Sequence, residues 1–145
     1  MQSDSKYIVR FKEGILSRTE ELHRIRTVVE DEAVRFGFDR ETAFRMALAV
    51  DEACTNIIKH SYSGNPRKKF EMEICTGNDR FVVVLTDYGR SFNPNSLPKL
   101  DMKRYFELCM RGGLGVHIIK LVMDDVAYHI TDAHANELRL VKYLT

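Results

Sequence analysis

The spacing of apolar residues near the start of the chain predicts a short strand followed by a helix. Residues 6–11 alternate weakly between apolar and polar side chains, as in a half-buried strand, and Gly14 breaks that pattern. Ser17 and Glu20 have the spacing of a capping box, which marks the start of a helix. The helix itself is predicted by apolar residues that recur at helical intervals, namely Leu22, Ile25, Val29, Ala33 and Phe36.

A second helix is predicted directly after the first. Gly37 ends the first helix, and Asp39 is placed to cap the next one. The apolar positions of this second helix extend it to about Tyr62, before Gly64-Asn65-Pro66 ends it. They are Ala43, Met46, Ala47, Val50, Ala53 and Ile57.

Two strands follow, at residues 69–76 and 80–86, joined by a turn at Gly77-Asn78-Asp79. The second of these strands is apolar without alternation, which predicts that it is covered or closely flanked on both faces. A long stretch from Arg90 to Arg111 comes next, with only residues 101–109 faintly helical. Connections of this length are often functional lids, although a tolerated insertion would have the same composition.

The end of the chain predicts one more helix and a last hairpin. Gly112-Gly113-Leu114-Gly115 opens the helix, and glycines at a helix N-terminus suit anion binding, although this motif alone is weak. Strands near 126–131 and 136–143 close the chain. The whole order predicts an α+β fold, a two-layer sandwich in which helices cover one face of a mixed, mostly antiparallel sheet.

Three polar residues stand at four-residue intervals within the second helix: Glu52, Asn56 and His60. At about 100° per residue they share one stripe at the edge of the buried face. The residues of this helix segment that point into the core are Val50, Ala53, Cys54 and Ile57. A carboxylate, a carboxamide and an imidazole at a half-buried edge indicate a site, but a polar helix flank has the same spacing.

Composition limits the kinds of protein that this chain can be. A length of 145 residues fits one domain, 1–145, and a net charge of +1 without long basic runs argues against direct nucleic-acid binding. We expect no signal peptide, no membrane span and a cytoplasmic protein. Three widely spaced cysteines predict neither a disulfide framework nor a zinc site.

Three motifs in a fixed order carry a family resemblance: Glu52-x-x-x-Asn56, Asp87-x-Gly89-x-x-Phe92 and Gly112-Gly113-Leu114-Gly115. Together they resemble the Bergerat ATP-binding fold of the gyrase, heat-shock chaperone, histidine-kinase and mismatch-repair superfamily. The short chain and the phrases around residues 51–56 and 113–126 are similar to the bacterial anti-sigma factor serine kinases. A phosphate-binding P-loop sequence is absent from the chain.

The resemblance implies roles for the helical stripe. Asn56 would be the Mg²⁺ ligand, since a carboxamide oxygen coordinates the ion without adding charge. Glu52, one turn earlier, would face the attacking hydroxyl as a general base or orienting group. His60 occupies a position that is commonly basic in the family, near the phosphates.

The same resemblance places the nucleotide. Asp87 would accept from the exocyclic amine of adenine, and Gly89 would let the ring approach the backbone. Phe92 belongs to the same motif, and Asn136 stands where the family often has a threonine near the adenine. The residues implied at the phosphates, next to a lid at about 90–111, are Arg111, Gly112, Gly113, Leu114 and Gly115.

The resemblance therefore predicts an ATP- and Mg²⁺-dependent protein serine kinase. It would phosphorylate an anti-sigma factor antagonist of the small α/β type, sequester a sigma factor in another complex, and form a homodimer. Two alternatives remain. One is a nucleotide-gated binding module without phosphotransfer; the other is the catalytic part of a split histidine kinase whose phosphoacceptor lies on another polypeptide.

Overall fold

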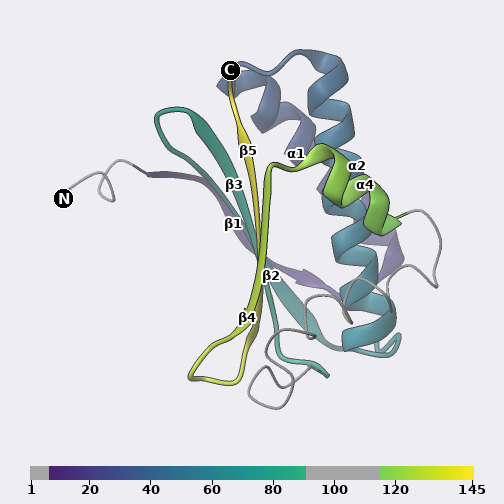
Figure 1. Cartoon of the computed structure of the whole chain (residues 1–145). Coiled ribbons are helices and arrows are strands. Elements are labelled where there is room, and N and C mark those ends of the chain that lie inside the picture. Colours follow the sequence, from purple (N-terminus) through teal and green to yellow (C-terminus); the bar gives the residue numbers. More distant parts are fainter. Residues whose placement is uncertain (1–6, 91–114) are drawn as a thin grey trace.

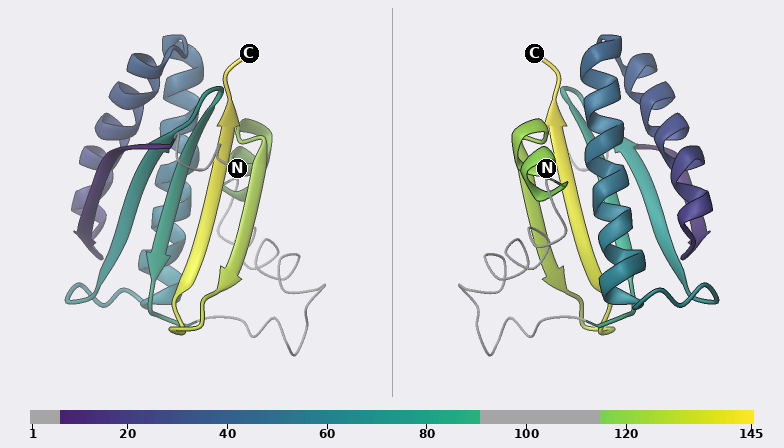
Figure 2. Two further views of the ribbon diagram at one scale, coloured as in Figure 1. Left: turned by 90° about the vertical axis from the view of Figure 1, so that its left-hand side faces the viewer. Right: turned by 90° about the vertical axis from the view of Figure 1, so that its right-hand side faces the viewer.

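A single antiparallel sheet with helices on one of its faces forms the described part of the protein (Figures 1 and 2). The computed structural model describes residues 7–90 and 115–145, and its side chains from Ile118 onward in the second range. The strand order is β1-β2-β3-β5-β4. The elements are β1 Ile8–Leu16, a 3₁₀ turn Thr19–Glu21, α1 Leu22–Phe36, α2 Arg40–Asn56, the π-helical turn η3 Ile57–Ser61, β2 Lys69–Thr76, β3 Arg80–Asp87, α4 Gly115–Val122, β4 Asp125–Ile130 and β5 Asn136–Tyr143.

The predicted fold class and element order are confirmed. Each strand begins or ends within a few residues of its predicted limits. The second hairpin strand is buried on its inner face and partly covered on its outer face, where Val82 is enclosed but Val84 and Thr86 are half-buried. Every strand pair in the described residues is antiparallel, so the parallel pair that a mixed sheet would contain is not among them.

The first strand is longer than its sequence pattern predicts. β1 continues through Gly14 to Leu16, because Gly14 pairs in register with Glu71 of β2 and Ile15 enters the core. A glycine in a strand lacks a side chain to pack, but its neighbours on the ladder keep its backbone extended. The prediction that Gly14 ends this strand is therefore wrong.

The predicted capping box at Ser17 and Glu20 is also wrong. Ser17 is buried, its N–H donates to the Lys68 carbonyl at 2.9 Å, and its hydroxyl has no partner within the described chain. A 3₁₀ turn separates Ser17 from α1, and no side chain caps either element. The hydrogen bond to Lys68 at the end of the β1–β2 pair therefore holds Ser17 away from α1, the helix that it was expected to cap.

The junction between α1 and α2 follows its sequence signals. Gly37 ends α1 with a φ of 130°, and its N–H returns to the carbonyls of Ala33 and Val34. Asp39 caps α2, because its carboxylate accepts from the Thr42 N–H at 2.7 Å. The end of α1 and the start of α2 thus lie where their sequence predicts, whereas α2 ends at Asn56 instead of near Tyr62, because the π-helical turn η3 follows it.

The core lies between the helix layer and the inner face of the sheet. Alternate residues of β2 and β3 point inward, and α2, whose buried face carries small residues, packs closely against α1 and α4. Tilted and edge-on contacts join the rings of Phe36, Phe38 and Phe81 at one end of this core. The largest fully buried side chains include Phe70, Phe81, Ile15, Met46, Met72, Ile74, Leu85 and Leu140.

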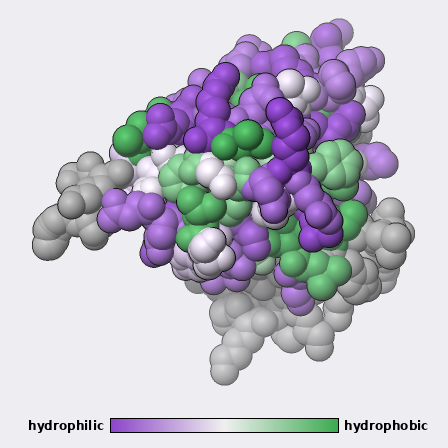
Figure 3. All heavy atoms as spheres, turned by 90° about the horizontal axis from the view of Figure 1, so that it is seen from above, coloured by the Kyte–Doolittle hydropathy of each residue, from purple (hydrophilic) through white to green (hydrophobic). Residues whose placement is uncertain are grey.

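The face that lies at the top of Figure 1 carries both hydrophilic and apolar groups. Seen from above, apolar groups form separate patches between hydrophilic residues (Figure 3). Within the described ranges, no helix has both the length and the apolar character needed to cross a bilayer.

Candidate functional site

The C-terminal half of α2 carries the polar stripe. Its inner face is buried as predicted, with Val50, Ala53 and Cys54 fully enclosed, and burial raises the pKa of the Cys54 thiol. Glu52 and Asn56 lie half-buried on successive turns at the edge of this face. The carboxylate and the carboxamide therefore share one side of the helix, as their spacing predicts.

The helix changes its geometry directly after Asn56. From Ile57 to Ser61 the backbone forms a π-helical turn, in which the Tyr62 N–H donates to the Ile57 carbonyl at 3.0 Å. A π turn holds more residues than an α turn, so His60 does not follow Asn56 by one regular α-helical turn. His60 is exposed, whereas Glu52 and Asn56 are half-buried.

Asp87 ends β3 as a buried acid, with 4% of its surface exposed. Its Oδ1 atom accepts from the Gly89 N–H at 2.9 Å and from the Asn136 Nδ2 at 2.8 Å, and the Ser61 side chain adds a further hydrogen bond. Burial raises the pKa of Asp87, and these three hydrogen bonds oppose the rise. The residue is thus a desolvated acceptor held by neutral donors.

Gly89 joins the Asp87 turn to the end of the helix. A Cβ atom at this position would lie 2.2 Å from the Ser61 carbonyl oxygen, so only glycine fits without a shift of the backbone. The Arg90 N–H donates to that same carbonyl at 2.8 Å. The end of β3 and the π-helical turn therefore meet backbone to backbone.

Tyr62 reinforces this junction. Its hydroxyl accepts from the Tyr88 N–H at 2.9 Å and donates to the Lys69 carbonyl at 2.6 Å. The sequence interpretation missed Ser61 and Tyr62, which follow the polar stripe directly. The one signal for them in the sequence is their position at the end of the helix. A polar group at the end of a helix that borders a site can form hydrogen bonds with the loop that follows.

Asn136 is the first residue of β5 and pairs directly with Asp87 of β3. Only 1% of its surface is exposed. The structure therefore brings Asp87, Gly89 and Asn136 together, although 49 residues separate Asp87 from Asn136. Glu52 and Asn56 reach the same end of the molecule through the junction of η3 with the Asp87 turn.

Buried polar atoms without partners are concentrated in this region. In the described residues they are the Ser17 hydroxyl oxygen, the Asn56 Nδ2 and the Asn136 Oδ1. Native proteins satisfy nearly all such atoms, so each exception requires a reason. Two of the three belong to asparagines that the sequence motifs had placed in one site.

Asp51, next to Glu52, links the two long helices. Its Oδ2 accepts from the Arg26 guanidinium of α1, and its Oδ1 accepts from the Thr55 hydroxyl at 3.2 Å. The Asp51 side chain is 16% exposed, so this pair is better shielded from solvent than a surface ion pair. The sequence interpretation missed it, because a contact between separate helices leaves no periodic signal.

The other predicted site residues lie at the edge of the described ranges or beyond them. Gly115 is the first residue of α4, in agreement with a glycine motif that opens a helix. Phe92, Arg111, Gly112, Gly113 and Leu114 lie outside the described residues, as does the predicted lid.

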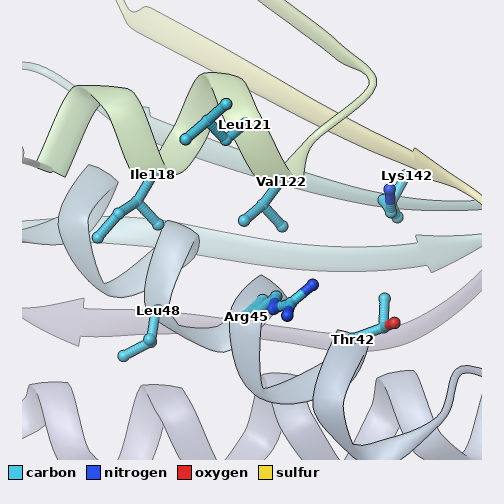
Figure 4. A pocket seen from close by; sticks show the side chains of 7 residues that line it. All are labelled: Thr42, Arg45, Leu48, Ile118, Leu121, Val122 and Lys142. Atoms are coloured by element: carbon cyan, nitrogen blue, oxygen red, sulfur yellow. The ribbon is translucent and has the colours of Figure 1, made fainter.

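A separate groove of about 400 Å³ lies between α2 and α4 (Figure 4). Aliphatic side chains from both helices face it, and two cationic side chains lie toward one end. Its lining residues include none of the predicted site residues: they are Thr42, Arg45, Leu48, Ile118, Leu121, Val122 and Lys142. The groove is therefore distinct from the polar cluster around Asp87.

Comparisons with known proteins place this arrangement in a family. Residues 15–142 match the family model described as the histidine kinase-like ATPase domain. The serine-protein kinase RsbW of Bacillus cereus is 32% identical over 118 residues, which cover 77% of this chain and 72% of that protein. RsbW of Bacillus mycoides has the same identity and coverage.

A structural comparison agrees on the fold. A chain of the SiaB–SiaC complex from Pseudomonas aeruginosa superposes with a TM-score of 0.67 at 16% sequence identity. The match covers 92% of this chain and 89% of that one. The protein described here therefore belongs to the histidine kinase-like ATPase family, in its branch of anti-sigma factor serine kinases, and is an ATP-using protein kinase.

Proposed function

We propose that this kinase transfers the γ-phosphate of ATP to a serine of an anti-sigma factor antagonist and, in another complex, sequesters a sigma factor. The observation that carries the proposal is the meeting of the buried acid Asp87 with the end of the helix that bears Glu52 and Asn56. The relatives named serine-protein kinase support serine as the acceptor.

Asn56 would hold Mg²⁺ through its carboxamide oxygen. The residue fits this role because it is uncharged, half-buried and has an amide nitrogen without a partner in the described chain. The bound ion would offset the negative charge of the phosphates. The free N–H groups of Asn56 suit a phosphate oxygen next to the ion.

Glu52 would act on the hydroxyl of the substrate serine. As the serine oxygen forms a bond to the γ-phosphorus, the bond from that phosphorus to the β–γ bridging oxygen breaks and ADP leaves. Glu52 accepts the proton that the serine hydroxyl loses. Its neighbour Asp51, bound to Arg26, holds this turn of α2 in place.

The buried cluster at the end of β3 would hold the adenine. Asp87 is the acceptor for the exocyclic amine, and Gly89 leaves room for the ring beside the backbone. Along the phosphates we place His60 and Gly115, together with residues outside the described ranges: Arg111, Gly112, Gly113 and Leu114. Phe92 completes the Asp87 motif at the edge of the adenine pocket.

The assembly that we propose is a homodimer that acts in the cytoplasm as one catalytic domain per chain. Its partners are a small α/β antagonist with a target serine and a sigma factor. A fold like this one occurs in the SiaB–SiaC complex, which supports recognition of a second protein as a use of the fold.

The test is phosphotransfer to an anti-sigma factor antagonist from the same genome. Incubation with Mg-ATP should give phosphoserine, detected by mass spectrometry. Glu52→Ala should lower the rate by at least about 100-fold, the usual contribution of a general base, while ATP still binds. Glu41→Ala is the matched control, because it removes an exposed glutamate of the same helix that forms an ion pair with Arg45 on the helix surface.

Other outcomes separate the alternatives. ATP binding without transfer would contradict the kinase proposal and favour a nucleotide-gated binding module. Acid-labile phosphohistidine on a partner protein would favour a split histidine kinase. An unchanged rate in Glu52→Ala would remove Glu52 from the proposed mechanism.

A further inference from the structure

The groove between α2 and α4 continues the polar stripe along α2. Arg45, Leu48 and Glu52 follow one another at intervals of three and four residues, so they lie on the same side of that helix. Leu48 lines the groove one turn before Glu52. Ile118 of α4 lies at the same end of the groove, one turn after Gly115, the first residue of its helix (Figure 4). One end of the groove therefore borders the residue proposed to accept the proton of the substrate serine.

Aliphatic side chains form the part of the groove next to that end. Leu48, Ile118 and Val122 are half-buried there, and Leu121 lies beside them with 84% of its surface exposed. Single exposed apolar residues are ordinary, but Leu121 extends an apolar lining that is already concave. Because the groove is open on this side, an occupant covers it from outside, as a segment of another protein does.

The opposite end of the groove is positively charged. Its lining contains two cationic side chains, Arg45 and Lys142, and no acidic one among the residues that the structure describes. Arg45 uses its Nη2 atom in the ion pair with Glu41, and its side chain is 60% exposed. A guanidinium carries five N–H donors, so Arg45 retains donors for a second carboxylate.

Lys142 also retains capacity for another carboxylate. Its Nζ atom lies 3.5 Å from Asp124 Oδ1, which is longer than a strong charge-assisted hydrogen bond. The second oxygen of Asp124 accepts from the Tyr143 N–H at 2.7 Å, so the backbone shares this acid. Charge complementarity therefore favours an acidic group on any partner that lies over this end of the groove.

The distance between the two ends fits a short stretch of polypeptide. At about 1.5 Å per residue, Arg45 and Glu52 lie about 10 Å apart along the axis of α2. An extended chain advances about 3.3 Å per residue, so about three of its residues span this distance. A serine placed at Glu52 would then have its neighbours over the aliphatic lining and an acidic residue about three positions away, at Arg45.

We infer that this groove is the docking surface for the acceptor protein, and that it selects a segment with aliphatic side chains beside the target serine and an acidic residue about three positions from it. The inference rests on the proposed phosphotransfer at Glu52 and adds the chemistry of the substrate segment. Leu48 and Leu121 contact the aliphatic side chains, and Arg45 and Lys142 bind the acid. These contacts are the same before and during transfer, so they set the affinity for the acceptor and not the rate of the chemical step.

The experiment measures steady-state phosphotransfer at saturating Mg-ATP while the concentration of the antagonist varies. Arg45→Glu turns an attraction into a repulsion, so the KM for the antagonist should rise about tenfold, while kcat and the KM for ATP stay unchanged. Arg35→Glu is the matched control and should leave all three values unchanged. It makes the same change of charge at an exposed arginine that pairs with Glu32 on its own helix, outside the groove.

Leu121→Gln tests the apolar part of the groove. Leu121 is exposed in the free protein, so glutamine should leave the fold intact but remove the apolar surface that docking buries. The KM for the antagonist should again rise about tenfold at constant kcat. Phe44→Gln is its control, since Phe44 is an apolar residue of α2 that is 50% exposed and does not line the groove.

Charge reversal on the acceptor identifies the acidic residue. Each Asp or Glu near the target serine of the antagonist is changed to Lys, one at a time. One of these variants should have a higher KM than the unchanged antagonist with the wild-type kinase and a lower KM than it with Arg45→Glu.

Thermal unfolding of each variant checks its fold. A KM for the antagonist equal to that of wild type in folded Arg45→Glu and Leu121→Gln overturns the inference and leaves the proposed phosphotransfer intact. Equal effects of Arg45→Glu and Arg35→Glu also overturn it. A groove that joins two copies of this chain would give Leu121→Gln a lower mass in analytical ultracentrifugation at an unchanged KM, again overturning the inference. Absence of phosphotransfer by the wild-type protein would instead overturn the proposed function, and the inference with it.

Discussion

Asp87 suits a ligand because it is a buried acceptor, but burying its charged form destabilises the folded protein. Burial raises its pKa above that in the unfolded chain, so the folded protein holds this proton more tightly than the unfolded chain does. Its contribution to the free energy of unfolding is therefore fully present below about pH 4 and is lost as the pH rises through the raised pKa.

Asp87→Asn should reveal this opposition. An asparagine keeps an Oδ1 acceptor for the Gly89 N–H but carries no charge to desolvate. We expect the free energy of unfolding without nucleotide to rise by about 1 kcal/mol at pH 7 and to be unchanged near pH 3, while ATP affinity falls. Urea unfolding at the two pH values checks this, and an equal change at both would contradict the assignment to charge.

At the same site, Gly89 is required because there is no room for a side chain. Gly89→Ala would place a Cβ atom 2.2 Å from the Ser61 carbonyl oxygen and force β3 away from η3. We expect a loss of about 2 kcal/mol in the free energy of unfolding together with weaker ATP binding. Gly14→Ala is the control, because its nearest contact would be 3.9 Å away, at a flexible lysine side chain. Equal effects of the two substitutions would contradict the close approach at Gly89.

Among the helices and strands, periodicity predicted the features that depend on one buried face of an element. It missed the features that depend on contacts between residues far apart in the sequence. The caps at Gly37 and Asp39 and the buried face of α2 follow from local sequence, since each depends on neighbours within a turn or two. The length of β1, the failure of Ser17 to cap α1 and the Arg26–Asp51 pair depend on partners elsewhere in the chain.

The candidate site shows the same division. The stripe of Glu52 and Asn56 was predictable from helical spacing, but the π-helical turn that displaces His60 from it was not, because its hydrogen bonds differ from those that the spacing assumes. Asp87 and Asn136 were each singled out, yet their pairing follows only from the strand order β3-β5, which requires the whole sheet.

For the whole molecule, the sheet order predicts how stability is distributed. β3 lies between β2 and β5, with its inner face buried and its outer face partly covered, whereas β1 and β4 are the edges of the described sheet. Backbone amides of β3 should therefore exchange with solvent more slowly than those of β4 by at least about 100-fold. Hydrogen–deuterium exchange followed by mass spectrometry measures this, and comparable rates in the two strands would contradict it.

The π-helical turn also has a consequence for how the sequence can change. Such a turn accommodates one residue more than a regular α-helix would in the same length. Deleting a single residue between Ile57 and Ser61 would therefore let the helix become regular over the same length, without turning the chain that follows. Deleting a residue from the regular part of α2 would instead rotate everything after it by about 100°. Related sequences should consequently tolerate a gap of one residue within this segment more readily than a gap within α2.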